Sequence, residues 1–238
     1  MSQVRLVAFD LDGTLTQHKT PLDPVNRAVL DALGQKYKLL MVGAGGAMRI
    51  FNQLEGYPID VIGNYGLQQG VYDKETGTLN IVRDLTFPCE RESVAERITA
   101  LRERFGFTEF AGENVEFHTS GCVTFPVLGT KAKAEDKLSF DPDRSKRRAI
   151  YEDVKAAFPE YVVFVGGSSS FDMAPRPYDK YHALAQYCEE AGISLDEVVY
   201  VGDDYGPGGN DESVYRSEIR FIPVDDYTQL GECVKDLL

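Results

Sequence analysis

An apolar run over residues 4–9 leads directly into the sequence Asp-Leu-Asp-Gly-Thr-Leu at residues 10–15, and this transition constrains the fold more than any other feature. The run predicts a short, buried strand. Two carboxylates, Asp10 and Asp12, follow it at a glycine turn, a composition that is also common in plain strand-end turns. Open α/β sheets bind ligands at the carboxyl ends of parallel strands. Because two acids in one cleft repel each other and resist joint ionisation, the pair predicts a bound divalent cation.

Strand and helix patterns alternate after this first strand. Asp23 and Pro24 indicate a helix N-terminus, with an acidic cap before a proline at the first helical position. The alternation predicts an α/β fold with a mostly parallel sheet. The predicted elements are a helix from Pro24 to Gly34, a strand over 38–42, a helix through Ile50 and Leu54, a strand at 61–62, a helix over 181–191, and strands over 198–201 and 220–222.

The pattern changes near Asp84, where strands and helices become grouped. Ser93 and Glu96 predict a capping box at the start of an amphipathic helix. Two prolines, Pro175 and Pro177, mark the return to the earlier alternation. We therefore predict an α+β module over residues 85–176, inserted into a parallel-sheet core formed by residues 1–84 and 177–238.

Composition restricts the partners of the protein. Lysine and arginine total 25 against 38 acidic residues, so the formal charge of −13 argues against nucleic acid or an anionic membrane as a main partner. No stretch approaches the ~20 apolar residues of a membrane span. The scattered cysteines predict reduced thiols, a cytoplasmic location and no zinc site. One basic cluster is interpreted as a solvated helix start: Arg144, Lys146, Arg147 and Arg148.

Two further features could carry chemistry. Lys180 stands at a predicted helix start, where a lone lysine is either a solvated surface group or a fixed cation that holds a phosphoryl oxygen. The acidic turn at residues 202–204 follows an apolar strand and continues through a glycine-rich stretch to Asn210 and Asp211. This segment is either a loop with helix-capping acids or part of an oxygen shell for Mg²⁺, which prefers carboxylates, carbonyls and water.

Taken in chain order, these features resemble the haloacid-dehalogenase (HAD) superfamily of phosphotransferases. The glycine turn at residues 43–46, which follows the strand at 38–42, stands at the place of the family's second motif. The inserted module lies between this turn and the lysine, which is similar to the Cof-type or IIB class, and the chain as a whole resembles eukaryotic-type phosphomannomutases. The resemblance implies a HAD-like Rossmannoid parallel-sheet core with an inserted α+β cap domain. The segments that carry it are Asp12-Gly13-Thr14-Leu15-Thr16, Asn64-Tyr65-Gly66-Leu67, Gly166-Gly167 with Ser170-Phe171-Asp172, and Pro207-Gly208-Gly209-Asn210-Asp211.

The resemblance also implies roles for the acidic residues and the lysine. Asp10 would attack phosphorus and form an aspartyl-phosphate. Asp12 would act as general acid and then as general base. Lys180 would hold a phosphoryl oxygen and offset carboxylate charge. The implied Mg²⁺ ligands are the Asp10 carboxylate, the Asp12 backbone carbonyl and Asp203, with Asn210 and Asp211 as outer ligands.

Substrate contacts are implied in both modules. In the core, the glycine turn opens a helix, so that the backbone N–H groups of Gly43, Ala44 and Gly45 would hold phosphate oxygens. In the cap, two positions match family residues that touch sugar hydroxyls, and a lysine lies near them. These implied cap contacts are Ser170, Asp172 and Lys131.

The chain departs from the family in two places. The second motif of the family supplies a Ser or Thr hydroxyl, and here Gly45 occupies that position. The family's cap arginines, which grip the distal phosphate, are also missing, and the nearest cations are Lys131 and Lys133, which lack the bidentate fork of arginine.

These departures decide between the reactions that the family resemblance allows. A mutase must bind a bisphosphate at both ends, so weak distal contacts favour hydrolysis. We therefore predict a Mg²⁺-dependent phosphatase of small phosphorylated metabolites, with sugar phosphates as the expected class. The alternatives are a phosphomannomutase and a weakly active sugar-phosphate-binding homologue. The family also implies a homodimer through the cap.

Overall fold

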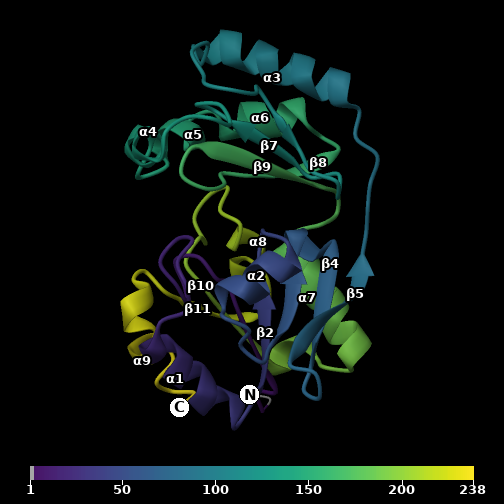
Figure 1. Ribbon diagram of the computed structural model, residues 1–238, viewed down its shortest axis with the longest axis vertical. Helices are drawn as coiled ribbons and strands as arrows, with labels where there is room; N and C mark the ends of the chain where they lie inside the picture. The colour runs from purple at the N-terminus through teal and green to yellow at the C-terminus, as the bar shows by residue number, and fades with distance from the viewer. Residues whose placement is uncertain (1–2) are drawn as a thin grey trace. The chain divides into compact units, whose positions relative to one another are not determined.

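The computed structural model describes residues 3–238 and divides into two compact units, which are described separately here (Figure 1). The first unit contains the chain up to Leu85 together with Asp179–Gly206 and Asp211–Leu238. The second unit contains Thr86–Tyr178 and Pro207–Asn210. Within residues 3–238, no helix combines the length and the apolar character needed to cross a membrane.

The described part of the first unit is built on a seven-stranded sheet in the order β11-β10-β1-β2-β3-β4-β5. Strands β11 to β3 in this order are parallel, and β4 and β5 add an antiparallel hairpin at one edge. The strand bounds are β1 Leu6–Phe9, β2 Lys38–Val42, β3 Asp60–Gly63, β4 Gln68–Asp73, β5 Thr78–Asp84, β10 Val198–Gly202 and β11 Arg220–Pro223.

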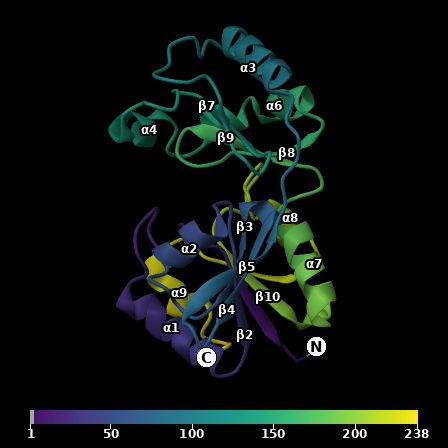
Figure 2. The same cartoon turned by 45° about the vertical axis from the view of Figure 1, so that its right-hand side comes forward.

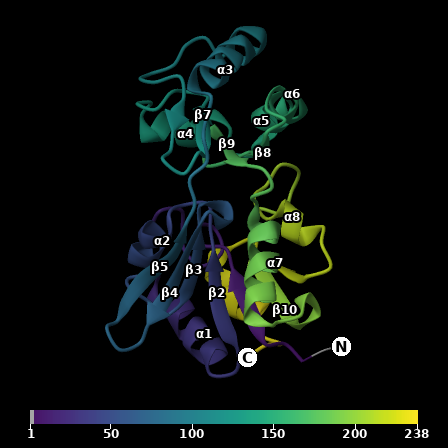
Figure 3. The same cartoon turned by 90° about the vertical axis from the view of Figure 1, so that its right-hand side faces the viewer.

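Helices cover both faces of this sheet (Figure 3). Side chains alternate along β1, so that Val7 and Phe9 pack on one face while Leu6 and Ala8 pack on the other. The first face is covered by α1 Pro24–Gly34, α2 Ala47–Gln53 and α9 Leu230–Cys233, and the second by α7 Lys180–Ala191 and α8 Glu212–Tyr215. Short 3-10 turns complete the unit: η1 Asn64–Gly66, η2 Leu195–Glu197 and η3 Tyr227–Gln229.

The local signals for the first helix are confirmed. Helix α1 starts at Pro24, and the Asp23 carboxylate accepts hydrogen bonds from the N–H groups of Val25 and Asn26 at 2.8 and 2.9 Å. The predicted fold class is also confirmed, because the parallel core sheet and a separate antiparallel sheet are both present. The β4–β5 hairpin was not predicted. Its edge strand β5 buries only Leu79 among its seven residues, which leaves a weak hydrophobic pattern.

The second unit contains a four-stranded antiparallel sheet in the order β6-β7-β9-β8. Helices α3 and α6 cover one face of it, over a core that includes Phe125, Phe171 and Met173 (Figure 2). Because side chains alternate along a strand, Thr124 and Asp172 point to the other face. The bounds are β6 Glu116–Phe117, β7 Val123–Pro126, β8 Tyr161–Phe164, β9 Ser170–Pro175, α3 Arg91–Phe105, α4 Ala134–Phe140, α5 Ser145–Arg148 and α6 Tyr151–Ala157.

The predicted capping box is wrong, although the amphipathic helix is present. Helix α3 begins at Arg91 with Glu90 as its N-cap, and no side chain caps it. Ser93 and Glu96 therefore lie inside the helix. The apolar residues of α3 face the sheet as expected, so tertiary packing sets the helix start three residues earlier than the local pattern indicates.

The interpretation of the basic cluster as a solvated face is wrong for Arg147. This side chain is fully buried, and its Nε donates to Asp141 Oδ2 at 2.8 Å. Its terminal nitrogen also donates to the carbonyls of Gly166, Gly167 and Ser170 at 2.6, 3.2 and 2.9 Å. A buried guanidinium is tolerated when its donors are satisfied in this way. The arginine thus ties the loop before β9 to the helical segment.

Candidate active site

A buried carboxylate lies at the carboxyl end of β1. Asp10 follows Phe9 directly, and its N–H donates to the Val201 carbonyl at 2.9 Å. The residue is 5% exposed. Because β1 is flanked by the parallel strands β2 and β10, Asp10 stands where sheets of this kind place their ligand sites.

Lys180, the first residue of α7, is fully buried beside Asp10. Its Nζ donates to Asp10 Oδ1 at 2.5 Å and to Asp211 Oδ1 at 2.7 Å. The helix start is fixed by Asp179, whose carboxylate accepts from the His182 N–H at 2.7 Å. The lysine is therefore a cation held between two carboxylates, and not a surface group.

Two acids from the loop between β10 and α8 complete the cluster. Carboxylate oxygens of Asp10, Asp203 and Asp211 all lie within 4.8 Å of one another. The Thr14 hydroxyl donates to Asp203 Oδ1 at 3.0 Å, and the Asp204 N–H donates to Asp211 Oδ2 at 3.0 Å. Three carboxylates at this spacing fit a hard cation such as Mg²⁺, which takes oxygen ligands.

Gly13 lets the turn after β1 approach this cluster closely. Its φ of +99° lies in the left-handed region that favours glycine. A Cβ atom at this position would come within 2.4 Å of Asp203 Oδ2. A larger residue would therefore displace either the turn or the carboxylate.

Burial and mutual repulsion shape the protonation of the cluster. Burial raises the pKa of Asp10 well above its usual range, although the Lys180 ammonium opposes this rise. Burial and the charge of Asp211 raise the pKa of Asp203 to about 6. Burial disfavours the charge of Lys180, but Asp10 and Asp211 outweigh that effect and raise the pKa of the lysine. If all three acids were ionised, they would carry more negative charge than one ammonium can balance.

The stability of the protein should therefore fall as pH rises from about 4 to about 7 in the absence of divalent cations. Carboxyls with a raised pKa bind protons more tightly in the folded state, so their ionisation destabilises the fold, by about 3 kcal/mol for a shift like that of Asp203. Thermal unfolding measured across this pH range checks the prediction. Mg²⁺ should reduce the fall, and a melting temperature that rises with pH through this window without Mg²⁺ would contradict it.

The Asp12 carboxylate has a different set of partners. Its Oδ1 accepts from the Lys19 N–H and from Gln53 Nε2, both at 2.7 Å. An Arg49 nitrogen lies 3.9 Å from its Oδ2, and the side chain is 21% exposed. The carboxylate is therefore held in place by these donors while it stays in contact with solvent, which permits proton exchange.

The glycine turn before α2 leaves some of its backbone donors available. The Gly43 N–H donates to the Ile62 carbonyl at 2.9 Å, and the Ala47 N–H donates to Gln68 Oε1 at 3.0 Å. The described residues supply no acceptor for the N–H groups of Ala44 and Gly45. Of the three predicted phosphate contacts, Gly43 thus uses its N–H within the sheet, and the other two keep theirs free.

The predicted cap contacts lie in the second unit. Asp172 is partly buried, its Oδ1 accepts from the Thr124 hydroxyl at 3.0 Å, and burial raises its pKa. Ser170 lies two residues earlier on the same face of β9, and its hydroxyl donates to the Gly166 carbonyl at 3.1 Å. Lys131 is exposed.

The two predicted outer ligands of the cation fall in different units. Asn210 is grouped with the second unit, whereas Asp211 is grouped with the first.

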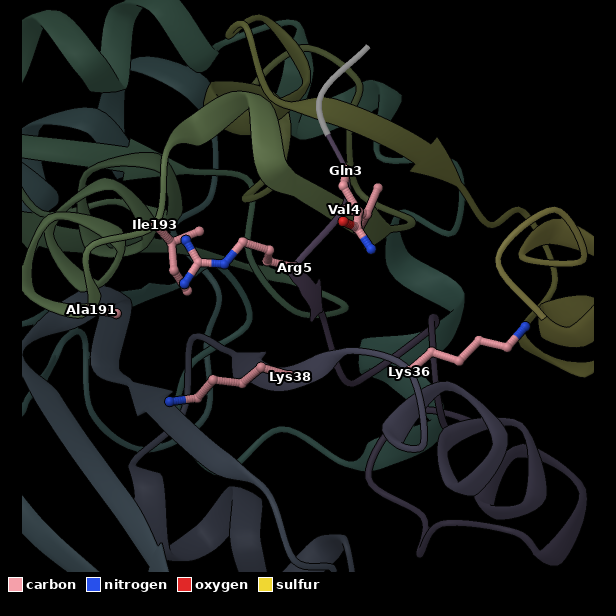
Figure 4. A pocket seen from close by; sticks show the side chains of 7 residues that line it. All are labelled: Gln3, Val4, Arg5, Lys36, Lys38, Ala191 and Ile193. Atoms are coloured by element: carbon pink, nitrogen blue, oxygen red, sulfur yellow. The ribbon is translucent and has the colours of Figure 1, made fainter.

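A cavity of about 490 Å³ opens elsewhere in the first unit, at the amino ends of β1 and β2 (Figure 4). Two of its cations already have acidic partners: Arg5 with Glu197 at 3.1 Å and Lys38 with Asp60 at 3.2 Å. The acidic cluster lies at the opposite ends of these strands, so the cavity is no part of it. Its lining residues are Gln3, Val4, Arg5, Lys36, Lys38, Ala191 and Ile193.

Several residues that contact the acids of the candidate site were not identified from the sequence. Tyr200 donates its hydroxyl to Asp211 Oδ1 at 2.6 Å, Thr14 donates to Asp203, and Gln53 donates to Asp12. The only available signal was a tyrosine in an otherwise valine-rich buried strand at residues 198–201. Sequence spacing does not show which of two faces such a side chain takes.

Solved structures with the same fold define the class. The chain matches Plasmodium falciparum IMP-nucleotidase with a TM-score of 0.69 at 17% identity, covering 99% of this chain and 68% of that one. It matches a HAD subclass IIB sugar phosphatase with a TM-score of 0.65 at 15% identity, covering 99% of this chain and all of the other. Together with the acidic cluster at the strand ends, these matches define a HAD-like α/β protein.

Sequence comparison then gives the family. The model for eukaryotic phosphomannomutase matches residues 27–225. Phosphomannomutase of Drosophila melanogaster is 27% identical over 234 residues, covering 94% of this chain and 90% of that protein. Phosphomannomutase of Saccharomyces cerevisiae is 27% identical over 222 residues, covering 90% and 85%. The chain therefore belongs to the eukaryotic phosphomannomutase family, and the resemblance found in the sequence is confirmed.

Proposed function

We propose that this protein transfers phosphoryl groups on hexose phosphates through an aspartyl-phosphate on Asp10. The observation that carries the proposal is the buried Lys180 ammonium, which bridges Asp10 and Asp211 within a cluster of three carboxylates. Burying such a cluster is unfavourable for the fold, and the arrangement is useful when a cation and an anionic phosphate enter it.

In the proposed reaction, a carboxylate oxygen of Asp10 attacks phosphorus, and the bond from phosphorus to the ester oxygen breaks. Asp12 gives its proton to that oxygen and then takes one from the incoming hydroxyl or water. The oxygen of that acceptor bonds to phosphorus, the bond from phosphorus to the Asp10 oxygen breaks, and the Asp10 carboxylate is restored. The Lys19 N–H and the Gln53 amide hold Asp12 for both steps. The free N–H groups of Ala44 and Gly45 would bind phosphoryl oxygens.

The proposed cation is Mg²⁺, held by the Asp10 and Asp203 carboxylates and the Asp12 carbonyl. When bound, it would reduce the repulsion between an anionic nucleophile and an anionic phosphate. Asp211 would act from outside, because its two oxygens already accept from Tyr200, Lys180 and the Asp204 N–H. Asn210 is proposed as a further outer ligand.

Mutase chemistry is the first candidate, because the family model and curated relatives named phosphomannomutase cover most of the chain. Ser170 and Asp172 are proposed to contact the sugar hydroxyls. The test is conversion of mannose-1-phosphate to mannose-6-phosphate with a catalytic amount of the hexose bisphosphate present. Isomer interchange by the wild-type protein is expected, and its absence would exclude the mutase.

Hydrolysis is the second candidate, because the second unit lacks arginines at the positions where the family places those that grip a distal phosphate. Two arginines of that unit are buried in structural contacts: Arg102 donates to the Val127 carbonyl at 2.7 Å, and Arg147 pairs with Asp141. Lys131, which is exposed, is the proposed contact for a distal phosphate, and it would act as a point charge without the bidentate fork of arginine. Release of inorganic phosphate without isomer interchange would establish this reaction.

A weakly active sugar-phosphate-binding homologue is the remaining alternative, suggested by Gly45 in place of a hydroxyl residue. One hydrogen bond to a charged group is worth about 1.5–3 kcal/mol, so its loss would slow transfer by about one to two orders of magnitude. Mg²⁺-dependent binding of beryllium trifluoride without turnover would identify this case.

Two further proposals concern the cellular location and the oligomeric state of the protein. All four cysteines are free thiols, which supports a location in the cytoplasm. A homodimer through the second unit remains a prediction, and light scattering of the purified protein would test it. The acidic net charge supports a small phosphorylated substrate over nucleic acid or membrane as the main partner.

A further inference from the structure

Tyr200 lies beneath the acidic cluster and takes no part in the reaction proposed above. It stands on β10 and is fully buried on the sheet face that α7 covers. Its ring stacks on Phe221 with centroids 5.6 Å apart at an angle of 29°. Its hydroxyl donates to Asp211 Oδ1 at 2.6 Å. A rigid, buried ring thus presents one hydroxyl to one carboxylate of the cluster.

The Asp211 carboxylate is held by three donors. Its Oδ1 accepts from the Tyr200 hydroxyl and from Lys180 Nζ, and its Oδ2 accepts from the Asp204 N–H. The backbone is adapted to this arrangement at Gly202. A Cβ there would lie 2.6 Å from Asp211 Oδ2 and 2.8 Å from a ring carbon of Tyr200. The carboxylate and the ring therefore fit only against a glycine.

Tyr200 and Lys180 share the same oxygen of Asp211, while Lys180 also serves Asp10. The distances from Lys180 Nζ are 2.7 Å to Asp211 Oδ1 and 2.5 Å to Asp10 Oδ1. A hydroxyl that donates to Asp211 offsets part of its negative charge and so weakens its attraction for the ammonium. Without that hydroxyl, Lys180 would move toward Asp211 and away from Asp10.

We propose that Tyr200 is a positioning residue, which fixes the Asp211 carboxylate and thereby keeps the Lys180 ammonium on Asp10. The inference rests on the proposed function, because it gives Lys180 a task at the phosphoryl group. It assigns Tyr200 no contact with substrate. The effect of Tyr200 passes along three hydrogen bonds, from Tyr200 to Asp211, from Asp211 to Lys180 and from Lys180 to Asp10.

The chain offers a matched control in Tyr187 on α7. That side chain is 4% exposed, and its hydroxyl donates to Asp60 Oδ2 at 3.1 Å. Asp60 Oδ2 also lies 3.2 Å from Lys38 Nζ, so this second site repeats the pattern of tyrosine, aspartate and lysine. It is no part of the acidic cluster. Removing either hydroxyl deletes the same kind of hydrogen bond.

The experiment compares Tyr200→Phe with Tyr187→Phe on a hexose phosphate and on p-nitrophenyl phosphate at saturating Mg²⁺. We expect Tyr200→Phe to lower kcat by about tenfold with KM within about twofold, because the displaced Lys180 ammonium would lose one hydrogen bond to the charged phosphoryl group in the transition state. Tyr187→Phe should keep kcat within about twofold. Both variants should melt at similar temperatures, which separates positioning from stability.

Two further measurements test the route through Asp211. In an Asp211→Asn background, the effect of Tyr200→Phe on kcat should shrink to less than about twofold, because residues that act as one unit are not additive. Mg²⁺-dependent binding of beryllium trifluoride, followed calorimetrically, should weaken about tenfold in Tyr200→Phe and stay unchanged in Tyr187→Phe. The binding measurement requires no turnover.

Equal kcat values for the two single variants would overturn the proposal, as would a tenfold effect of Tyr200→Phe that persists in Asp211→Asn. These outcomes leave the proposed function standing, because the wild-type protein would still turn over. A wild-type protein with neither turnover nor Mg²⁺-dependent binding of beryllium trifluoride would instead remove the proposed function and this inference with it.

Discussion

Asparagine in place of Asp10 is expected to lower phosphoryl transfer by at least about 1000-fold, because the amide cannot form the covalent aspartyl-phosphate. The substitution keeps the shape of the side chain, which is 5% exposed and packed at the end of β1. Phosphate release and isomer interchange, each measured over hours, make a loss of rate of about 1000-fold detectable. Activity within tenfold of wild type would contradict the role of Asp10 as nucleophile.

The same variant should be no less stable than the wild-type protein when Mg²⁺ is absent. Burial raises the pKa of Asp10, so its ionised form destabilises the fold at neutral pH, and asparagine removes that charge. We expect an equal or higher melting temperature at pH 7. Loss of activity without loss of stability would separate chemistry from folding.

Asp60→Asn is the matched control for this prediction. The Asp60 carboxylate accepts from the Tyr72 N–H at 3.0 Å and from the Tyr187 hydroxyl, and it pairs with Lys38 outside the cluster. Its replacement should lower the melting temperature and leave turnover within about twofold. Asp10→Asn is thus expected to lose activity and keep its stability, whereas Asp60→Asn is expected to lose stability and keep its activity.

Methionine in place of Lys180 should be the most destabilising single change in the cluster. The side chain is fully buried, and its removal leaves Asp10, Asp203 and Asp211 without a cation. Breaking a buried ion pair from one side costs about 3–5 kcal/mol, which denaturant unfolding at pH 7 without Mg²⁺ would measure. Turnover should fall by at least about 100-fold, because the fixed charge at the phosphoryl oxygens is lost.

Two comparisons make this prediction specific. Lys38→Met removes a half-exposed partner of Asp60 and should cost no more than about 1 kcal/mol. Adding Asp10→Asn to Lys180→Met should recover part of the lost stability, because one of the repelling charges is removed. If Lys180→Met lowered the free energy of unfolding no more than Lys38→Met does, the Lys180 ammonium would not be balancing the negative charge of the acids.

The parts of the fold that the sequence predicted correctly are those with signals a few residues long. Asp23 and Pro24 predicted the start of α1, and residues 38–42 form β2 with the predicted bounds. Gly192 in the left-handed region ends α7 where the sequence indicated. Caps, breakers and apolar runs act on their neighbours, so they can be interpreted without knowledge of the rest of the molecule.

The features that the sequence left open depend on packing. The β4–β5 hairpin lacks a strong apolar alternation, and the start of α3 follows burial and not the Ser93 pattern. Arg147 appeared as one charge among four, yet it is buried because Asp141 and three carbonyls satisfy its donors. Such partners come from different segments, and no local pattern identifies them.

The sequence by itself determined the fold class, the family and the acids that end β1 and β10. Only the tertiary structure decided how these groups share charge. It buries Lys180 between Asp10, which is 170 residues away in the chain, and Asp211, and it brings the Tyr200 hydroxyl to the same carboxylate. Electrostatic balance inside a protein depends on burial and on distances of a few ångströms, and the folded chain alone sets both.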